Sequence, residues 1–314
     1  MFLSIVVPCF NEEEGIHELY RRITSVCAGM DLSSYELVLI NDGSSDKTWS
    51  YMRALHEADN RIICINLSRN FGHQLALTAG LKIASGQRIF IIDADLQDPP
   101  ELLPAMMVRL DAGVDVVYGQ RIKREGETLF KKKSASLFYR LLDRLVDIDI
   151  PVDTGDFRLI SRRAVNALNC MPENHRFIRG MVTWIGMRQE AFPYERAARF
   201  AGTTKYPFVK MLKFAFDAIT GFSVKPLRFA SYLGVGAALL SVFLGAYVLY
   251  AWCEGQTVPG WTSLAVIMLL MGSCQLIVLG IMGEYVGRLY IEGKSRPLYV
   301  IQEVLAGSSK RSDT

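Results

Sequence analysis

The sequence of 314 residues predicts an α/β domain with a doubly wound, mostly parallel sheet, followed by a pair of transmembrane helices. Through the first 118 residues, short apolar segments typical of buried strands alternate with helical patterns. Such alternation indicates a parallel sheet covered by helices on both faces. Nearer the C-terminus lie two long uncharged runs, each exceeding the ~20 residues that cross a membrane as a helix.

Five strands and one clear helix are expected in the first 118 residues. The strands are 3–8, 35–42, 61–68, 88–93 and 115–119, and the helix is 73–84. Asn11, with Glu14 three residues later, has the spacing of a capping box and predicts a helix start. The sequence after the first strand lacks GxGxxG, which disfavours a dinucleotide-binding fold of the usual kind.

The two apolar runs, 229–253 and 255–283, contain no charged residue. The loop between them has no Lys or Arg, and basic residues stand only on the outer flanks: Lys225, Arg228, Arg288, Lys294 and Arg296. By the positive-inside rule, both ends of this hairpin are expected in the cytoplasm and the loop outside. A pair of buried core helices is the alternative interpretation.

These features predict a division of the chain. A cytoplasmic catalytic domain is expected over 1–208, with a nucleotide-binding half (1–118) and an acceptor half (119–208). An amphipathic segment at the membrane interface, or an ordinary surface helix, follows at 209–230. Transmembrane helices at 231–253 and 261–283 precede a cytoplasmic tail, 284–314, with a disordered polar end.

The general composition excludes some classes of protein. A net charge of +3 is too small to indicate nucleic-acid binding by itself. The six cysteines are scattered without a CxxC pair, which favours reduced thiols over a disulfide framework or zinc site. The N-terminus lacks a basic leader and becomes acidic at once, so the first domain is expected to stay in the cytoplasm.

Acidic residues follow several of the predicted strands, where open α/β sheets bind ligands. Asp93 and Asp95 end the fourth strand at i and i+2, and paired carboxylates there can hold Mg²⁺ together with substrate phosphates. Alternatively, Asp93 caps a helix that starts near Pro99 or Pro100. Asp42 ends the second strand, where a carboxylate can accept hydrogen bonds from a base or ribose.

Several segments together resemble family-two glycosyltransferases of the GT-A fold. They are VVPCFNEE, INDGSSDKT, RNFGHQLALTAGL, DADLQDPPEL, GDFRLISR and MGEYVGRLYIEGKSRP. More narrowly, they are similar to the polyprenyl-phosphate glycosyltransferases, which include dolichol-phosphate mannose synthases. RFIRGMVTWIG and GEYVGRLY most resemble the bactoprenol glucosyl transferases of this group. The resemblance spans nearly the whole chain, including the predicted membrane hairpin.

The resemblance implies roles for particular residues. It assigns Pro8, Phe10, Glu12 and Asp42 to the nucleotide, Asp93, Asp95 and Gln97 to Mg²⁺ or Mn²⁺ and the donor diphosphate, and Arg121 to the donor phosphates and sugar. It assigns Lys205, and Lys132 with Lys131 and Lys133 as alternatives, to the acceptor phosphate. Arg199 is predicted to join them, because two phosphates held near each other repel and need cations. The alternative interpretation is that these basic residues attract anionic lipids at the membrane surface.

Asp95 and Asp156 are the residues that the resemblance marks as catalytic. Asp156 could act as a base or orient the acceptor, and it could equally pair with Arg158 or cap a helix at Ser161. The four histidines are expected at surface or loop positions, although His73 lies close to the nucleotide edge.

The function implied by the resemblance is metal-dependent, inverting transfer of one hexose, glucose from UDP-glucose, to undecaprenyl phosphate. A lipid phosphate with a second pKa of about 6 is a dianion at neutral pH, so it needs no strong base. The implied location is the cytoplasmic face of the bacterial inner membrane, and a homo-oligomer is expected. GDP-mannose or UDP-amino-arabinose is the alternative donor, and a non-catalytic membrane scaffold is the alternative class.

Overall fold

A computed structural model describes residues 2–30, 32, 34–122, 151, 154–196, 221, 223–255 and 260–306. The chain separates into two compact units. The first holds the sheet and its covering helices, and includes the residues after Arg296. The second holds two long helices.

The first unit is built on one sheet of eight described strands in the order β7-β5-β6-β4-β1-β2-β3-β8. Their bounds are β1 (Leu3–Cys9), β2 (Tyr35–Asn41), β3 (Ile62–Leu67), β4 (Arg88–Ile91), β5 (Val116–Arg121), β6 (Thr154–Ser161), β7 (Gln189–Tyr194) and β8 (Ile301–Leu305). The four central strands β4, β1, β2 and β3 are parallel, as the sequence predicts. Strands β6 and β8 run antiparallel to their neighbours, so the whole sheet is mixed.

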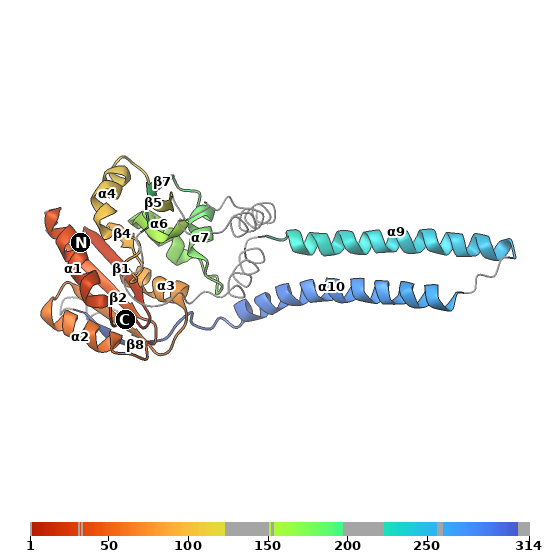
Figure 1. Cartoon of the computed structure of the whole chain (residues 1–314), viewed down its shortest axis with the longest axis horizontal. Helices are drawn as coiled ribbons and strands as arrows, with labels where there is room; N and C mark the ends of the chain where they lie inside the picture. The colour runs from red at the N-terminus through yellow and green to blue at the C-terminus, as the bar shows by residue number, and fades with distance from the viewer. Residues whose placement is uncertain are drawn as a thin grey trace. The chain divides into compact units, whose positions relative to one another are not determined.

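Helices cover both faces of this sheet (Figure 1). One face carries α1 (Ile16–Gly29), α2 (Thr48–Ala58), the short 3₁₀ helix η1 (Pro100–Leu102) and α4 (Leu103–Asp111). The other face carries α3 (His73–Ile83), α6 (Arg162–Cys170) and α7 (Ile178–Trp184). The doubly wound α/β architecture is therefore confirmed.

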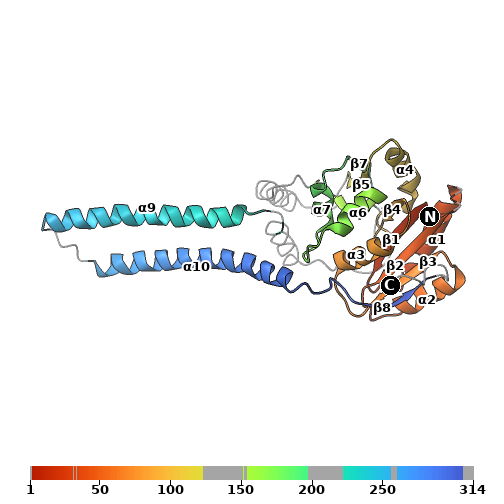
Figure 2. The ribbon, with the colours of Figure 1, turned by 180° about the vertical axis from the view of Figure 1, so that it is seen from behind.

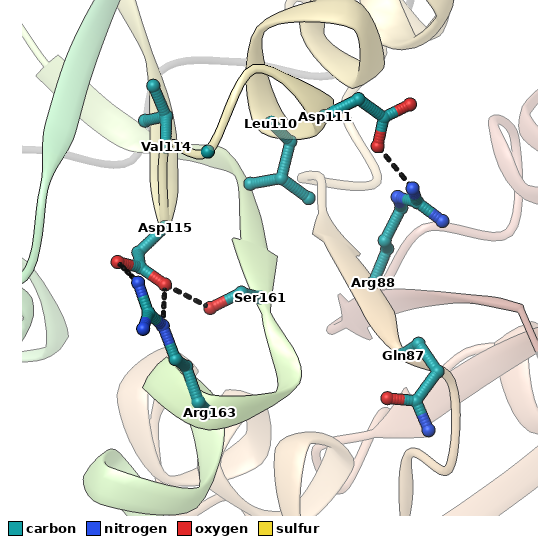
Figure 3. Close-up of a pocket in the computed structure, with 9 residues that line it drawn as sticks. Gln87, Arg88, Leu110, Asp111, Val114, Asp115, Ser161 and Arg163 are labelled. Carbon is teal, nitrogen blue, oxygen red and sulfur yellow. Dashed lines mark hydrogen bonds and ion pairs between the residues drawn. The ribbon is translucent and has the colours of Figure 1, made fainter.

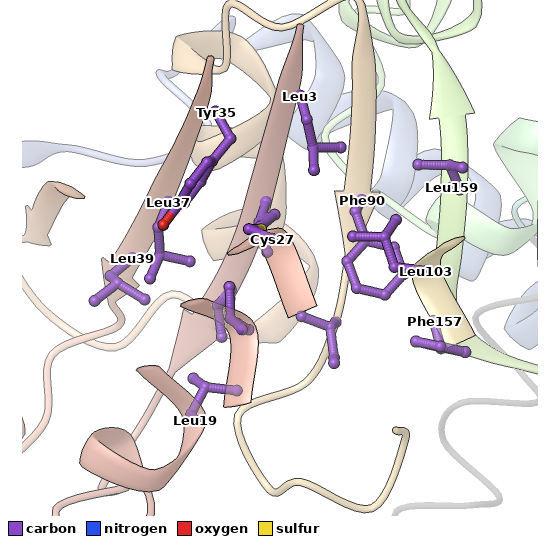
Figure 4. Close-up of a cluster of buried hydrophobic side chains, with 14 of the residues drawn as sticks. Leu3, Leu19, Cys27, Tyr35, Leu37, Leu39, Phe90, Leu103, Phe157 and Leu159 are labelled. Atoms are coloured by element: carbon purple, nitrogen blue, oxygen red, sulfur yellow. The ribbon is translucent and has the colours of Figure 1, made fainter. Parts of the chain in front are cut away.

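The main hydrophobic cluster lies between the sheet and the face covered by α1, α2 and α4 (Figure 4). Alternate residues of β1 and β2 enter it, because side chains of a strand point to opposite faces with a period of two. Phe90 and Phe157 pack edge to face with ring centroids 5.3 Å apart. Each large apolar side chain buried in this way contributes about 1.5–3 kcal/mol.

On the opposite face, α3 lies close against the sheet because of Gly80. A methyl group at Gly80 would lie 2.5 Å from a side-chain carbon of Val6 and 2.6 Å from one of Ile40. A larger residue at this position would force the buried Val6 and Ile40 side chains to move. The close packing fixes the start of α3, at His73, beside the ends of the parallel strands.

The capping box predicted at Asn11 is wrong. Helix α1 begins at Ile16 after Gly15, and no side chain among the described residues caps this helix. Asn11 lies earlier, in the left-handed region at φ 54°, where its Oδ1 accepts a hydrogen bond from the backbone N–H of Ser45. Asn adopts this conformation more readily than most residues, so its side chain joins two loops instead of capping a helix.

Part of the predicted C-terminal tail is a strand. Residues 301–305 form β8, which pairs antiparallel with the edge strand β3, and the Ser68 N–H bonds the Val300 carbonyl beside it. The polar end that the sequence predicts as disordered lies outside the described residues.

The second unit contains α9 (Lys225–Cys253) and α10 (Trp261–Gly293), which run side by side (Figures 1 and 2). Both are apolar enough to span a membrane, over 27 residues from Lys225 and 28 residues from Val266, and their apolar stretches are not buried. This exposure disfavours the alternative of buried core helices. Helix α10 continues ten residues beyond the predicted end of the second span, through Glu284 and Arg288. Most of the predicted amphipathic segment lies outside the described residues.

Candidate active site

Strand direction and register bring the predicted site residues to one edge of the sheet. The parallel strands β1, β2 and β4 all end at this edge, which we call the carboxyl edge. Strand β6 runs the other way, with Ile91 opposite Arg158, so its first residues, including Asp156, lie at the same edge. Strands β5 and β7 also end there, with Arg121 paired to Tyr194.

Two loops at the carboxyl edge, after β1 and after β2, are tied together. The Asn11 N–H bonds Ser44 Oγ at 3.0 Å, and the Glu12 N–H bonds Thr48 Oγ1 at 2.9 Å. Pro8 is buried within β1, whereas Phe10 is 39% exposed just beyond it. The loops therefore hold Phe10 and Glu12 next to the end of β2.

Asp42, at the end of β2, is buried and anchors the loop that follows β3. Its two carboxylate oxygens accept backbone hydrogen bonds from Phe71 at 2.7 Å and from Gly72 at 3.0 Å. Burial raises the pKa of Asp42, although these two bonds act against the shift. Gly43 has φ 67°, and a side chain there would collide with the backbone of Arg69 and Asn70. The close contact of the two loops thus depends on glycine.

The acidic turn after β4 has alternating burial. Asp93, Asp95 and Gln97 are half-buried, and the residues between them are buried. Leu96 lies in the left-handed region at φ 57°, an arrangement that costs a non-glycine residue about 1–3 kcal/mol and is typical of functional sites. The turn is closed by a bond from the Gln97 N–H to Asp95 Oδ1 at 3.2 Å.

Asp93 does not cap the following helix, because η1 starts after Pro99 without a side-chain cap in the described part of the chain. Instead, Asp93 Oδ1 is buried and has no hydrogen-bond partner among the described residues. Burial raises the pKa of Asp93, and the neighbouring carboxylates of Asp156, Asp98 and Asp95 raise it further, against the effect of His73. A buried carboxylate oxygen without a hydrogen-bond donor is suited to bind a cation.

Arginines and a tyrosine lie behind this acidic turn. Asp98 is fully buried, and its Oδ1 accepts a hydrogen bond from the Tyr194 hydroxyl, which in turn accepts one from Arg121 Nε at 3.3 Å. Arg196 lies 3.4 Å from Asp98 Oδ1 and 3.8 Å from Asp95 Oδ2. Arg121 is thus at the predicted edge, held through Tyr194 and Asp98.

Asp156 is only 2% exposed and is surrounded by hydrogen-bond donors. Gln74 Nε2 donates to Asp156 Oδ2 at 2.8 Å, His73 Nε2 lies 3.1 Å from the same oxygen, and Arg179 Nε donates to Oδ1 at 3.1 Å. Arg158, the partner considered from the sequence, is farther away, at 3.9 Å. Ser161 caps α6 with its own hydroxyl, so Asp156 has no capping role there.

His73 joins the two acidic groups of the edge. Its Nε2 is 3.5 Å from Asp93 Oδ1 and 3.1 Å from Asp156 Oδ2. Burial by itself lowers the pKa of His73, but the two carboxylates together raise it to about 9. Burial acts to raise the pKa of Asp156, yet Arg179 and His73 hold it well below the usual range.

Sequence reasoning missed the roles of His73, Gln74 and Arg179. His73 is expected near the nucleotide edge but without a role, and Gln74 follows it at the start of a predicted helix shortly after a strand, a position that could have marked it as an edge residue. Arg179 carries no such signal. The predicted acceptor residues Lys132, Arg199 and Lys205, with Lys131 and Lys133, lie outside the described residues.

A hollow of about 330 Å³ lies at the opposite edge of the sheet (Figure 3). Its charged side chains form internal pairs, Arg88 with Asp111 and Arg163 with Asp115, and Ser161 Oγ also donates to Asp115. The hollow lies apart from the acids, arginines and strained turn of the carboxyl edge. We therefore place the candidate active site at the carboxyl edge, despite the hollow elsewhere.

A mixed sheet with helices on both faces and acids gathered at its carboxyl edge is a GT-A-like fold, and the chain also has two long apolar helices. The chain belongs to the family described as Glycosyl transferase family 2, whose pattern matches residues 4–168.

Proteins of similar sequence cover nearly the full length of this chain. It is 48% identical over 313 residues to an uncharacterized glycosyltransferase of Bacillus subtilis, covering 98% of this chain and 95% of the relative. It is 41% identical to the prophage bactoprenol glucosyl transferase homolog of Escherichia coli, covering 97% and 99% of the two chains. Among solved structures, glucosyl-3-phosphoglycerate synthase from Mycobacterium tuberculosis is similar with a TM-score of 0.47 and 19% identity, over 70% of this chain and 77% of that one.

Proposed function

We propose that this enzyme transfers a single glucose from UDP-glucose to a polyprenyl phosphate. The proposal is supported chiefly by the relatives named bactoprenol glucosyl transferase, at about 40% identity over 95% or more of both chains. Their alignment with this chain is long enough to include both apolar helices as well as the sheet. A lipid acceptor gives those helices a purpose, since they hold the enzyme where its substrate is embedded.

The donor is proposed to lie along the carboxyl edge. Phe10 and Glu12 on the β1 loop, Asp42 at the end of β2 and Pro8 beneath them would contact the nucleotide. Asp42 retains acceptor capacity beyond its two backbone bonds, because an ionised carboxylate has about four lone-pair sites. Arg121 would contact the donor phosphates and sugar from the other side of the acidic turn.

The acidic turn fits a divalent cation, Mg²⁺ or Mn²⁺. Asp93 Oδ1 is a buried carboxylate oxygen without a hydrogen-bond partner in the described part of the chain, and Asp95 and Gln97 supply the hard oxygen ligands such ions prefer. The described residues contain no group of three or more His, Cys, Asp or Glu side chains suited to share a metal. Donor phosphates would therefore complete the coordination, and the bound ion would neutralise the leaving diphosphate.

The acceptor phosphate would attack the anomeric carbon, with inversion of configuration. As a dianion at neutral pH it is already a nucleophile, so positioning and charge neutralisation would supply the catalysis. Lys132, Arg199 and Lys205 are proposed to hold this phosphate, because two phosphates brought together need cations between them.

The proposed location is the cytoplasmic face of a bacterial inner membrane. The two apolar helices support membrane association, and the basic residues outside the hairpin support cytoplasmic termini. We also propose that copies of the chain associate into a homo-oligomer through their membrane hairpins.

The test is a transfer assay with full-length protein, undecaprenyl phosphate and Mg²⁺. Each nucleotide sugar (UDP-glucose, GDP-mannose and UDP-amino-arabinose) is supplied separately, and the lipid product is identified by mass. A hexosyl lipid from UDP-glucose, lost on addition of EDTA, is the expected result. Transfer from one of the other donors alone would keep the proposed reaction but change the proposed sugar. No transfer from any donor would favour the non-catalytic scaffold.

A further inference from the structure

Gln74 connects three elements at the carboxyl edge. Its side-chain Nε2 donates to Asp156 on β6, and its Oε1 accepts the backbone N–H of Ile178 at 2.9 Å. Ile178 is the first residue of α7, and the next residue, Arg179, donates to the other Asp156 oxygen. The amide of Gln74 therefore fastens the first turn of α3 to Asp156 and to the first turn of α7.

Both oxygens of Asp156 are engaged by this arrangement. Oδ2 faces His73 and Gln74, and Oδ1 faces Arg179. With the carboxylate almost completely buried, these donors replace the water that would otherwise solvate its charge. A proton taken from a substrate would have to displace one of them.

The surrounding charges also oppose protonation of Asp156. Cationic side chains face it from three elements: His73 on α3, Arg179 on α7 and Arg158 on β6 itself. Asp93, after β4, is the neighbouring acid, and His73 lies between the two. The pKa of Asp156 is accordingly held well below its usual range, which agrees with the geometry.

We propose that Asp156 is a positioning residue, a permanently ionised anchor that His73, Gln74 and Arg179 hold in place and that fixes α7 against α3 beside the donor site. Asp156 takes no proton during the reaction. The inference rests on the proposed function, in which the acceptor phosphate needs no general base. It extends that function by giving His73, Gln74 and Arg179 a shared role in setting the geometry of transfer.

The test reverses the polarity of one hydrogen bond. Asp156→Asn leaves one acceptor oxygen between two donors, so the new NH2 group faces either the Gln74 amide or Arg179, and we expect kcat to fall about 100-fold. Adding Gln74→Glu to the same protein returns a carboxylate to the pair, with its second oxygen still able to accept the Ile178 N–H. We expect this double variant to recover at least about 10-fold of the lost kcat.

Two controls accompany the pair. Gln74→Glu alone sets a half-buried carboxylate against the buried one of Asp156 and should lower both kcat and the thermal midpoint of unfolding. Lys82→Gln changes an exposed residue of the same helix, outside the site, and should leave both unchanged. Thermal unfolding of every variant reports whether the anchor forms, independently of activity.

Recovery of both kcat and thermal midpoint in the double variant supports the proposal. Recovery of the midpoint without kcat would overturn it, because the carboxylate at position 156 would then be needed for the chemistry itself. Recovery of neither would refute the anchoring geometry. If wild-type protein transfers no sugar from any donor, the proposed function fails, and the thermal midpoints then decide whether the anchor exists.

Discussion

Both edges of the sheet in this glycosyltransferase carry acidic side chains near arginines. The acids are paired with arginines at one edge and crowded together at the other. At the edge with the hollow, Asp111 and Asp115 each have an arginine partner, and Ser161 adds a further bond to Asp115. At the carboxyl edge, Asp93, Asp95, Asp98 and Asp156 lie close enough to affect one another. Two of their buried oxygens, on Asp93 and Asp98, have no hydrogen-bond partner among the described residues.

The difference distinguishes side chains that stabilise the fold from side chains that are available to bind a ligand. Paired charges with satisfied hydrogen bonds stabilise a fold and leave no unsatisfied polar atom for a ligand to bind. Crowded acids, incompletely bonded oxygens and the left-handed Leu96 at a sheet edge carry a cost that a bound cation and phosphate can offset. We therefore expect substitutions at the two edges to have opposite effects on activity and stability.

The largest effect is expected for Asp95→Ala at the carboxyl edge. Loss of this proposed metal ligand should lower sugar transfer about 1000-fold, because metal stabilisation of the leaving diphosphate is worth several kcal/mol. The rate of lipid-sugar formation measures it. Asp115→Ala is the matched control at the other edge and should keep nearly full activity. Equal losses in both variants would remove the functional distinction between the edges.

Asp115→Ala should instead reduce stability. It removes the partner of the exposed Arg163 and the hydrogen bond from the half-buried Ser161 hydroxyl, and loss of that hydrogen bond costs about 1 kcal/mol. Urea unfolding of the wild type and the variant measures the change. An unchanged midpoint would show that the pairs at this edge contribute little, and that the contrast with the carboxyl edge is only apparent.

Asp93→Asn should raise stability while lowering transfer. The folded state holds this half-buried carboxylate near three other acids, with its buried Oδ1 lacking a hydrogen-bond partner among the described residues, so neutralising it should stabilise the fold by about 1 kcal/mol. The measurement is thermal unfolding without metal or nucleotide. A lower midpoint would mean that the contact with His73 already satisfies Asp93.

The smallest effect concerns pH. Hydrogen bonds from Arg163 lower the pKa of Asp115 in the folded chain, so its contribution is complete above the unfolded pKa of about 3.9 and disappears as the pH falls through the lower, folded value. The stability difference between wild type and Asp115→Asn should thus shrink below about pH 4. A constant difference down to pH 2 would contradict this account.

Local sequence pattern is enough to predict the parallel core and the acids that follow its strands. The apolar runs of β1 to β4 and the position of Asp93 and Asp95 are properties of short segments, which periodicity detects. The local pattern does not predict strand β6, because this strand carries Asp156 and Arg158 among its apolar residues. It does not predict β8 either, because that strand follows the long apolar helices.

Contacts between distant segments cannot be predicted in this way. Gln74 meets Asp156 and Ile178 across 82 and 104 positions of the chain, and only the packed sheet and helices bring them together. The wrong capping box at Asn11 has a similar cause. Its side chain bonds Ser45, 34 residues later, so a tertiary contact overrides the local signal.

The most direct test of the account is binding of Mn²⁺, measured by electron paramagnetic resonance in the presence of UDP. Full-length wild type, Asp95→Ala and Asp115→Ala are compared at equal protein concentration. We predict that wild type and Asp115→Ala bind Mn²⁺ in a UDP-dependent manner and that Asp95→Ala does not. Equal binding by all three proteins would contradict a metal and nucleotide site at the carboxyl edge.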